Sequence, residues 1–163
     1  MANYVLNKVT LTGDKARIFE LLEAIKYDEL DIGSIDFNKI IPAPVDEDGL
    51  ISRDWCIANW GTKWNALFEG TDGEVFEISE DSVQIAFETA WSGACPIIEH
   101  LAETNVDLCF EHEWADEGIA NEECGKNTYS NGQCVNRYFP EGKEAMRFAC
   151  EVWGFEWVEE DWD

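Results

Sequence analysis

The sequence predicts an α+β fold in which an antiparallel sheet carries helices on one face. Short segments with alternating apolar and polar residues recur along the chain, and this period is typical of strands with one buried face. Between them lie segments with apolar residues three and four positions apart, as on an amphipathic helix. Hydrophobic residues make up 45 % of the 163 positions, which is enough to form the core of a single domain.

The first strand and the first helix have the clearest local patterns. Residues 3–12 alternate in polarity, and Val5, Val9 and Leu11 fall on one face together with Asn7. Asp14 is a typical N-cap residue for the helix that follows. The expected buried stripe of that helix consists of Ile18, Leu21, Leu22 and Ile25.

A second strand is expected over residues 35–41, since Pro42 and Pro44 then prevent further strand pairing. Residues 42–74 follow as a long insertion that is rich in tryptophan. An ordinary connection between two elements is much shorter, so this insertion is a distinct feature of the fold. It contains an acidic turn at residues 46–49 and three tryptophans, Trp55, Trp60 and Trp64.

Three strands and a helix are predicted in the middle of the chain. Residues 75–79 and 83–91 alternate as strands, and the second places its odd-numbered residues, from Val83 to Trp91, on one side. Pro96 suits the first turn of a short helix. Residues 107–114 form the next strand, and we expect its odd-numbered residues to face solvent: Asp107, Cys109, Glu111 and Glu113. The even face is expected to be apolar, with His112 on it.

The C-terminal part is predicted to contain a hairpin and a helix. Asn131-Gly132 is a strong signal for a two-residue hairpin turn, which would pair Tyr129 with Cys134. A helix is expected from about Glu141 to a stop at Gly154. The acidic tail that follows contains aromatic residues, so at least part of it is expected to dock on the body.

This order of elements fits a ferredoxin-like antiparallel sheet with its helices on one face. We therefore expect a single domain over residues 1–163. Its core comprises residues 1–41 and 75–115, interrupted by the insertion at 42–74, and the hairpin, helix and acidic tail at 116–163 extend it.

Two tryptophan motifs resemble those of the YubB ferredoxin-like family of phage and plasmid proteins. They are Asn59-Trp60-Gly61-Thr62-Lys63-Trp64-Asn65, and Phe87-Glu88-Thr89-Ala90-Trp91-Ser92 followed by Pro96. Ile40-Ile41-Pro42 and the acidic stretch 113–132 fit the same pattern, whereas Gly93-Ala94-Cys95 replaces the consecutive prolines that often follow the serine. The resemblance implies the fold and an accessory role in a mobile element, such as counter-defence, without implying catalytic residues.

The charge of the chain is strongly negative and unevenly distributed. There are 35 Asp and Glu residues against 11 Lys and Arg, a formal charge of -24. Residues 64–125, a run of 62, contain 16 of the acids and no Lys or Arg. Such a charge repels phosphate and argues against binding of free nucleic acid, but it favours a basic protein partner.

We therefore predict an acidic mimic that blocks the nucleic-acid-binding cleft of a host nuclease, either a CRISPR effector or a restriction-type enzyme. A solvated surface that serves only solubility, or adaptation to high salt, would explain the same composition. The residues predicted to bind the partner are Glu77, Glu80, Asp81, Asp107, Glu111, Glu113, Asp116, Glu117, Glu122 and Glu123.

An alternative function is a non-catalytic module for a small ligand or a protein, with its site in the insertion. Exposed aromatic rings in a polar loop can stack on a ligand or anchor a protein interface. The same rings can instead pack the insertion onto the sheet. The residues of this alternative site are Trp55, Trp60, Lys63, Trp64 and Asn65.

Other classes of function have weak support in the sequence. The six cysteines form no CxxC pair, and His100 and His112 lack metal-ligand spacing, so we expect neither a metal nor a cofactor. No phosphate-binding loop or nucleophile motif is present, which argues against an enzyme. No apolar run approaches the roughly 20 residues of a membrane span, and we expect a cytoplasmic protein.

Overall fold

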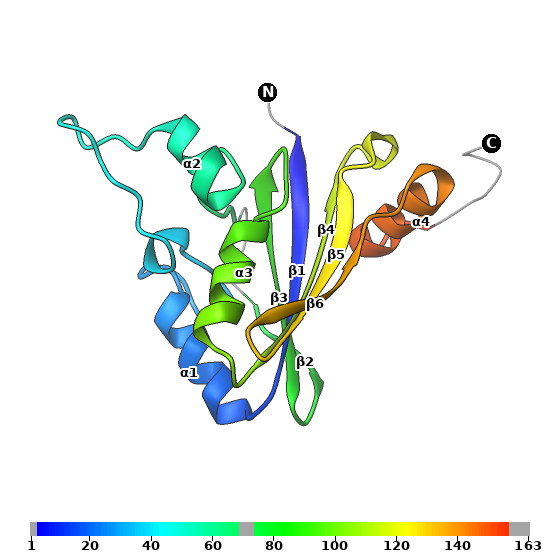
Figure 1. The fold of residues 1–163 in the computed structure, drawn as a ribbon, viewed down its shortest axis with the longest axis horizontal. Coiled ribbons are helices and arrows are strands. Elements are labelled where there is room, and N and C mark those ends of the chain that lie inside the picture. Colours follow the sequence, from blue (N-terminus) through cyan, green and yellow to red (C-terminus); the bar gives the residue numbers. More distant parts are fainter. Residues whose placement is uncertain (1–2, 69–73, 157–163) are drawn as a thin grey trace.

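The computed structural model describes residues 3–68 and 74–156, and within them six strands form one antiparallel sheet (Figure 1). The strand order is β2-β3-β1-β4-β5-β6. The first four of these strands complete the strand, helix, hairpin, helix, strand order of a ferredoxin-like unit, and the β5–β6 hairpin extends it beside β4. The bounds are β1 Tyr4–Thr12, β2 Phe76–Ser79, β3 Ser82–Ala90, β4 Cys109–Asp116, β5 Cys124–Ser130 and β6 Gln133–Tyr138.

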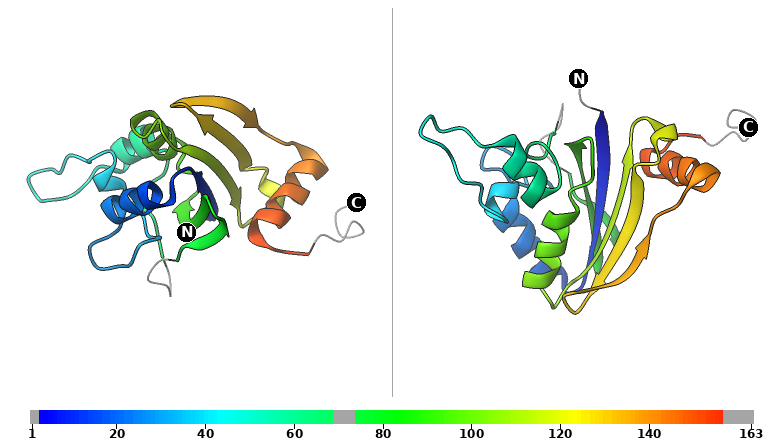
Figure 2. Two further views of the ribbon diagram at one scale, coloured as in Figure 1. Left: turned by 90° about the horizontal axis from the view of Figure 1, so that it is seen from below. Right: turned by 45° about the horizontal axis from the view of Figure 1, so that its top comes forward.

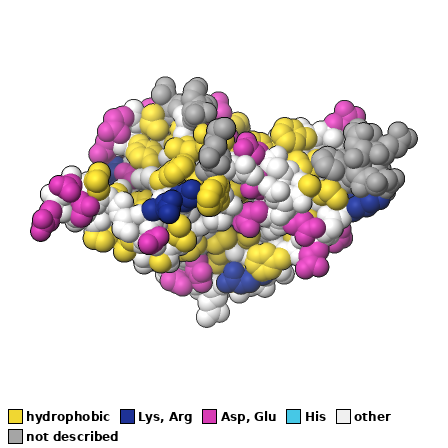
Figure 3. Space-filling view, turned by 90° about the horizontal axis from the view of Figure 1, so that it is seen from above, with side chains coloured by type: hydrophobic (Ala, Val, Ile, Leu, Met, Phe, Trp, Pro, Cys, Tyr) yellow, Lys and Arg dark blue, Asp and Glu magenta, His cyan; other side chains and the backbone are white. Residues whose placement is uncertain are grey.

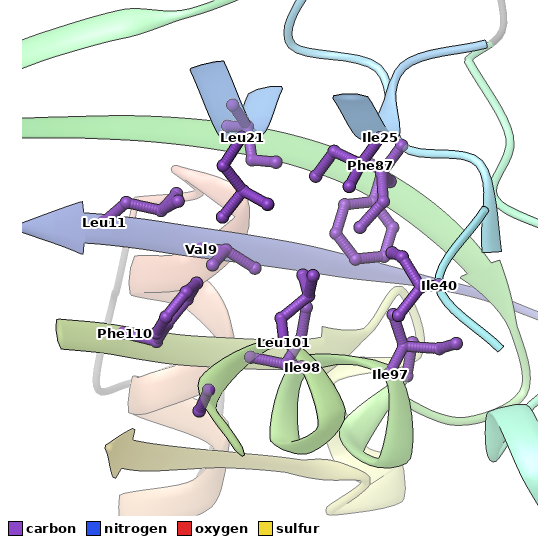
Figure 4. Close-up of a cluster of buried hydrophobic side chains, with 14 of the residues drawn as sticks. Val9, Leu11, Leu21, Ile25, Ile40, Phe87, Ile97, Ile98, Leu101 and Phe110 are labelled. Carbon is purple, nitrogen blue, oxygen red and sulfur yellow. The ribbon is translucent and has the colours of Figure 1, made fainter. Parts of the chain in front are cut away.

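The main core lies between one face of the sheet and two helices, α1 (Lys15–Ile25) and α3 (Cys95–Thr104). Figure 4 shows side chains of β1, β3 and β4 pointing toward the apolar faces of these helices. The predicted stripe of α1 is fully buried, and Asp14 caps the helix by accepting a hydrogen bond of 3.0 Å from the Arg17 N–H. Local polarity patterns were therefore sufficient to locate β1, α1 and α3.

Residues 35–41 do not form the predicted strand. They contain a short 3₁₀ helix, η1 (Phe37–Lys39), whose first turn is capped by the carboxylate of Asp36. Phe37 is fully buried against Trp60 and Phe87, so its burial arises from a turn that docks on the core. The second strand of the ferredoxin-like order is β2 instead.

The insertion contains a helix that the sequence did not reveal, α2 (Arg53–Trp60). Ser52 caps it by accepting a bond of 3.3 Å from the Trp55 N–H, and it ends at Gly61. Only Cys56 and Trp60 are buried among its eight residues, so the helical stripe is too short to be recognised.

The C-terminal hairpin has the predicted pairing, with Tyr129 opposite Cys134 and Ser130 opposite Gln133. Helix α4 (Gly142–Trp153) follows and ends at Gly154 as predicted. It packs on the face of the sheet opposite to α1 and α3 (Figure 2), where a second, smaller core forms around Ala115 and Cys124. Phe155 stacks on Trp153 and is half exposed, whereas the expected docking of Trp157 and Trp162 lies outside the described residues.

Candidate functional site

The acids predicted on the solvent-facing side of β4 lie beside two lysines from the neighbouring strands. Glu113 pairs in register with Lys8 of β1 on one side and with Lys126 of β5 on the other. The Nζ atom of Lys126 lies 2.7 Å from an oxygen of Glu111. Although no base occurs near Glu111 and Glu113 in the sequence, the sheet brings two bases beside them, and these bases offset the charge of the two acids.

The other predicted acids divide between the two ends of the sheet. Glu77, Glu80, Asp81 and Asp107 lie at the lower end in Figure 1, near the β2–β3 turn. Two of them are in ion pairs, Glu77 with Lys15 and Asp107 with Arg17. The remaining four lie at the upper end, about 24 Å away along β4, since a strand rises roughly 3.4 Å per residue. These four are Asp116, Glu117, Glu122 and Glu123.

Asp116 has a structural role and is not available to a partner. It is only 5 % exposed, and one of its oxygens accepts hydrogen bonds from the side chain of Asn3 and the backbone N–H of Gly118. The side chain of Asn121 donates a third bond of 3.3 Å. Asp116 therefore holds the loop that connects β4 and β5.

Most of the alternative ligand site is also structural. Trp60 is 1 % exposed, and its indole N–H donates to the carbonyl of Ile41 at 2.8 Å. Trp55 is partly buried and packs edge-on against Trp60. Asn65 accepts a bond from the Phe37 N–H and donates one to Asp36. These three residues fix the insertion to the core, as the packing interpretation of the tryptophans predicts.

Lys63 and Trp64, unlike the other residues of the alternative site, do not fix the insertion to the core. They form an exposed cluster with Trp91 that we call the Trp91 platform. The ammonium nitrogen of Lys63 lies 3.4 Å from the ring centroid of Trp91 and 5.7 Å from that of Trp64. Trp64 is 41 % exposed and Trp91 is 52 % exposed. Sequence alternation placed Trp91 on the same side of the strand as Val83 and Phe87, but the strand ends at Ala90 and the ring is exposed.

The backbone of Trp91 has an unusual conformation, with φ of 70°. Bulky residues rarely adopt positive φ, and such strain is concentrated at functional sites. The two tryptophan motifs hold this conformation together. The hydroxyl of Thr62 donates to the Ala90 carbonyl and accepts from the Ala90 N–H, and the Ser92 hydroxyl donates to the carbonyl of Gly61.

Next to the platform, across Gly93, lies a hollow that we call the Glu123 pocket. Its volume is about 260 Å³, and Trp114 and Phe139 form its aromatic walls with their ring centroids 6.1 Å apart. The indole N–H of Trp114 and the backbone N–H of Gly93 interact with the Glu123 carboxylate and favour its charged form. Burial nevertheless raises the pKa of Glu123 above its ordinary value, with a smaller contribution from Asp116.

The other residues that line the Glu123 pocket add charge and apolar surface. Burial raises the pKa of the Cys124 thiol to about 11, so the thiol is uncharged at neutral pH. Figure 3 looks onto this upper end of the molecule and shows acidic side chains distributed over it, with few basic ones. The remaining lining residues are Glu122, Pro140 and Glu141.

The buried histidine belongs to a polar network beneath these sites. Asn7 accepts the Ala94 N–H with its Oδ1 atom and donates to Thr89, so the orientation of its amide is fixed. His112 Nε2, 2.8 Å from the same Oδ1, must therefore donate, and Nδ1 carries no proton. Burial lowers the pKa of His112 to about 3. The imidazole is thus neutral and supports the loop that follows β3.

Cys95, at the start of α3, is not activated as a nucleophile. Burial raises the pKa of its thiol to about 12. The Nδ1 atom of His112 has no hydrogen-bond partner among the described residues, so the thiol does not pair with the imidazole. Within the same residues no group of three or more His, Cys, Asp or Glu side chains is arranged to hold a metal ion, and no helix is long and apolar enough to cross a membrane.

A comparison with known protein families gives one match. The family model described as the ferredoxin-like domain in Api92-like protein matches residues 59–159. The match contains every residue of the Trp91 platform and of the Glu123 pocket. No curated protein and no solved structure matches the chain. The narrower likeness to YubB proteins, with a phage or plasmid origin, stays a prediction.

Proposed function

We propose that this chain, which belongs to the family of the ferredoxin-like domain in Api92-like proteins, is a non-catalytic protein that occupies the basic nucleic-acid-binding cleft of another protein. Among the described residues, 22 Asp and Glu residues are exposed, against five Lys and Arg. An excess of this size steers a basic partner toward the molecule over long distances and supplies charge-assisted hydrogen bonds after docking.

The upper end of the sheet is the proposed contact surface. Glu117, Glu122, Glu123 and Glu141 lie there, and none of them forms an ion pair with a described base. The acids of the lower end and of the β4 face are partly neutralised by Lys15, Arg17 and Lys126. Exposed aromatic rings also lie at the upper end, where Phe139 is 59 % exposed, so this end combines free carboxylates with the anchors typical of interfaces.

The class of partner follows from the resemblance to mobile-element proteins. A host defence nuclease, either a CRISPR effector or a restriction-type enzyme, has the basic cleft that such a surface would fill. Binding there would block nucleic acid by competition, without any chemical reaction.

A competition experiment with charge-matched variants tests this proposal. Labelled DNA bound to a purified RNA-guided or restriction-type nuclease is titrated with the chain, and displacement is followed by fluorescence anisotropy at low and high salt. We expect displacement that weakens at high salt and is lost in the triple variant Glu117→Lys, Glu122→Lys, Glu141→Lys. The control, Glu80→Lys, Asp81→Lys, Glu103→Lys, has the same net charge. Equal loss in both variants contradicts the chosen surface.

The Trp91 platform favours a second candidate function, the binding of a small ligand. The strained and exposed ring of Trp91, with the Lys63 ammonium over it, would suit a planar ring that carries an anionic group. A thermal-shift screen with nucleotides and sugar phosphates tests this function. Stabilisation of the protein that disappears in Trp91→Ala supports it, whereas a shift that persists in this variant assigns the ligand to another place.

A further inference from the structure

We infer that the Glu123 pocket receives a single arginine side chain of the basic partner. This inference rests on the proposed function and specifies its anchor point. The pocket lies at the upper end of the sheet between β4, the β4–β5 loop and the segment that leads into α4.

The size of the pocket suits one side chain. Pockets for drug-sized ligands and cofactors have volumes of roughly 300–1,000 Å³. At about 260 Å³ the Glu123 pocket lies below this range. The end of one long side chain fits a hollow of this volume.

The walls of the pocket match the faces of a guanidinium group. Trp114 and Phe139 meet at an interplanar angle of 65°, and Phe139 is 59 % exposed. A planar guanidinium stacks on aromatic rings more favourably than an ammonium, because it is more weakly hydrated and its charge is delocalised. Since Trp114 is only 4 % exposed, the ring of Phe139 provides the stacking surface, and this surface favours arginine over lysine.

The carboxylates supply the acceptors that a guanidinium needs. Glu123 interacts with the Trp114 indole and the Gly93 N–H, and Glu122 is held by a hydrogen bond of 3.1 Å from the Gly142 N–H. Each carboxylate keeps further lone pairs for a ligand, since a carboxylate has about four acceptor positions. Glu141 also lines the pocket. A guanidinium with five donors can satisfy these acceptors in bidentate geometry.

Partial burial of Glu123 gives the pocket an electrostatic reason to bind a cation. The carboxylate is removed from water without a compensating positive charge, because the charged residue that affects its pKa is another acid, Asp116. A cation in the pocket would offset this cost, which an uncharged isostere cannot do.

A titration with N-acetyl-arginine amide tests the inference directly on the full chain. Binding is followed by NMR through the indole N–H signal of Trp114, identified by its loss in Trp114→Phe. We expect saturable shifts with a dissociation constant on the order of 1 mM, as is reasonable for one small ligand. The uncharged isostere N-acetyl-citrulline amide should cause no shift. Equal shifts with both compounds overturn the inference.

Two variants distinguish binding in the Glu123 pocket from attraction by the overall negative charge of the protein. Glu123→Gln keeps the shape of the side chain and should weaken binding of N-acetyl-arginine amide about tenfold, the effect of losing one charge-assisted bond. Glu103→Gln, at the lower end, removes the same charge and should leave the affinity unchanged. Equal weakening in the two variants refutes the pocket. If arginine amide does not bind while the chain still displaces DNA from a nuclease, the pocket is wrong and the proposed function stands.

Discussion

The ammonium nitrogen of Lys63 lies 3.4 Å from the ring centroid of Trp91, and the two residues come from motifs 28 positions apart in the sequence. Neither residue belongs to the core. Trp91 adopts φ of 70°, a conformation that costs an L-residue with a side chain about 1–2 kcal/mol. Retaining a strained, exposed tryptophan above a lysine is therefore better explained by recognition than by stability.

A pair of substitutions at Trp91 measures this strain. Trp91→Gly and Trp91→Ala both remove the ring, but only alanine keeps the penalty of positive φ. We expect the glycine variant to be more stable than the alanine variant by about 1 kcal/mol, although glycine is usually the less stable of the two. Urea unfolding measures the difference. A more stable alanine variant would show that the backbone relaxes to negative φ.

Asn7 is expected to be the most sensitive polar residue of the core. Its amide contacts Thr89, His112 and the Ala94 N–H, all in buried positions. Asn7→Ala leaves these groups unpaired, and we expect a loss of about 3 kcal/mol in the free energy of unfolding. Thr10→Ala, on the other face of the same strand, should cost less than about 1 kcal/mol. Similar losses in the two variants would contradict the network.

The buried imidazole of His112 makes stability depend on pH. Its pKa is about 3 in the folded protein and ordinarily 6.5, so the unfolded chain binds one more proton between these values. The contribution of His112 is complete above about pH 6.5 and is lost as the pH falls toward 3. From about pH 7 to about pH 5 the expected loss is about 2 kcal/mol.

The variant His112→Gln separates the contribution of His112 to the pH dependence from that of acids that titrate in the same pH range. Burial raises the pKa values of Glu113 and Glu123, so these groups favour the folded state as the pH falls and oppose the effect of His112. Urea unfolding gives the free energy of unfolding of the wild type and of His112→Gln at both pH values. The difference between the two proteins cancels the contribution of Glu113 and Glu123. Parallel pH dependences would show that His112 is not neutral in the folded state.

Local signals explain which elements could be predicted from the sequence. The cap at Asp14 and the turn at Asn131-Gly132 depend on neighbouring residues alone, and both were predicted correctly. Residues 35–41 have apolar side chains at strand-like spacing, but these side chains are buried by a turn docked on Trp60. Tertiary packing, which no local pattern records, determines their conformation.

The candidate site was harder to predict because it depends on strand register. Lys8 lies more than a hundred residues from Glu113 in the sequence, yet the two are opposite each other on adjacent strands. The Glu123 pocket likewise joins Trp114 to Phe139 through the β5–β6 hairpin. Lys63 and Trp64 belong to the predicted alternative ligand site, whereas Trp91 does not, since alternation along β3 placed it on the same side as the core residue Val83.

The Glu123 pocket owes its shape to two glycines on either side of Trp114. A Cβ atom added at Gly93 or at Gly125 would lie 2.6 Å from an atom of the Trp114 side chain. Gly125→Ala should therefore push the indole away from Glu123 and destabilise the protein by about 1–3 kcal/mol, the usual cost of overpacking. The Trp114 indole N–H signal, which reports the interaction with Glu123, should move in the same variant.

The double variant Trp114→Phe with Gly125→Ala shows whether this steric contact is the cause. The contacted atoms at Gly125 are Cζ2 and Cη2 of the indole, which a phenylalanine ring does not reach. We therefore expect Gly125→Ala to cost at least 1 kcal/mol less in the Trp114→Phe background than in the wild type. Equal costs in the two backgrounds would attribute the effect to the backbone of β5, which also approaches the carbonyl of Tyr138 at this point.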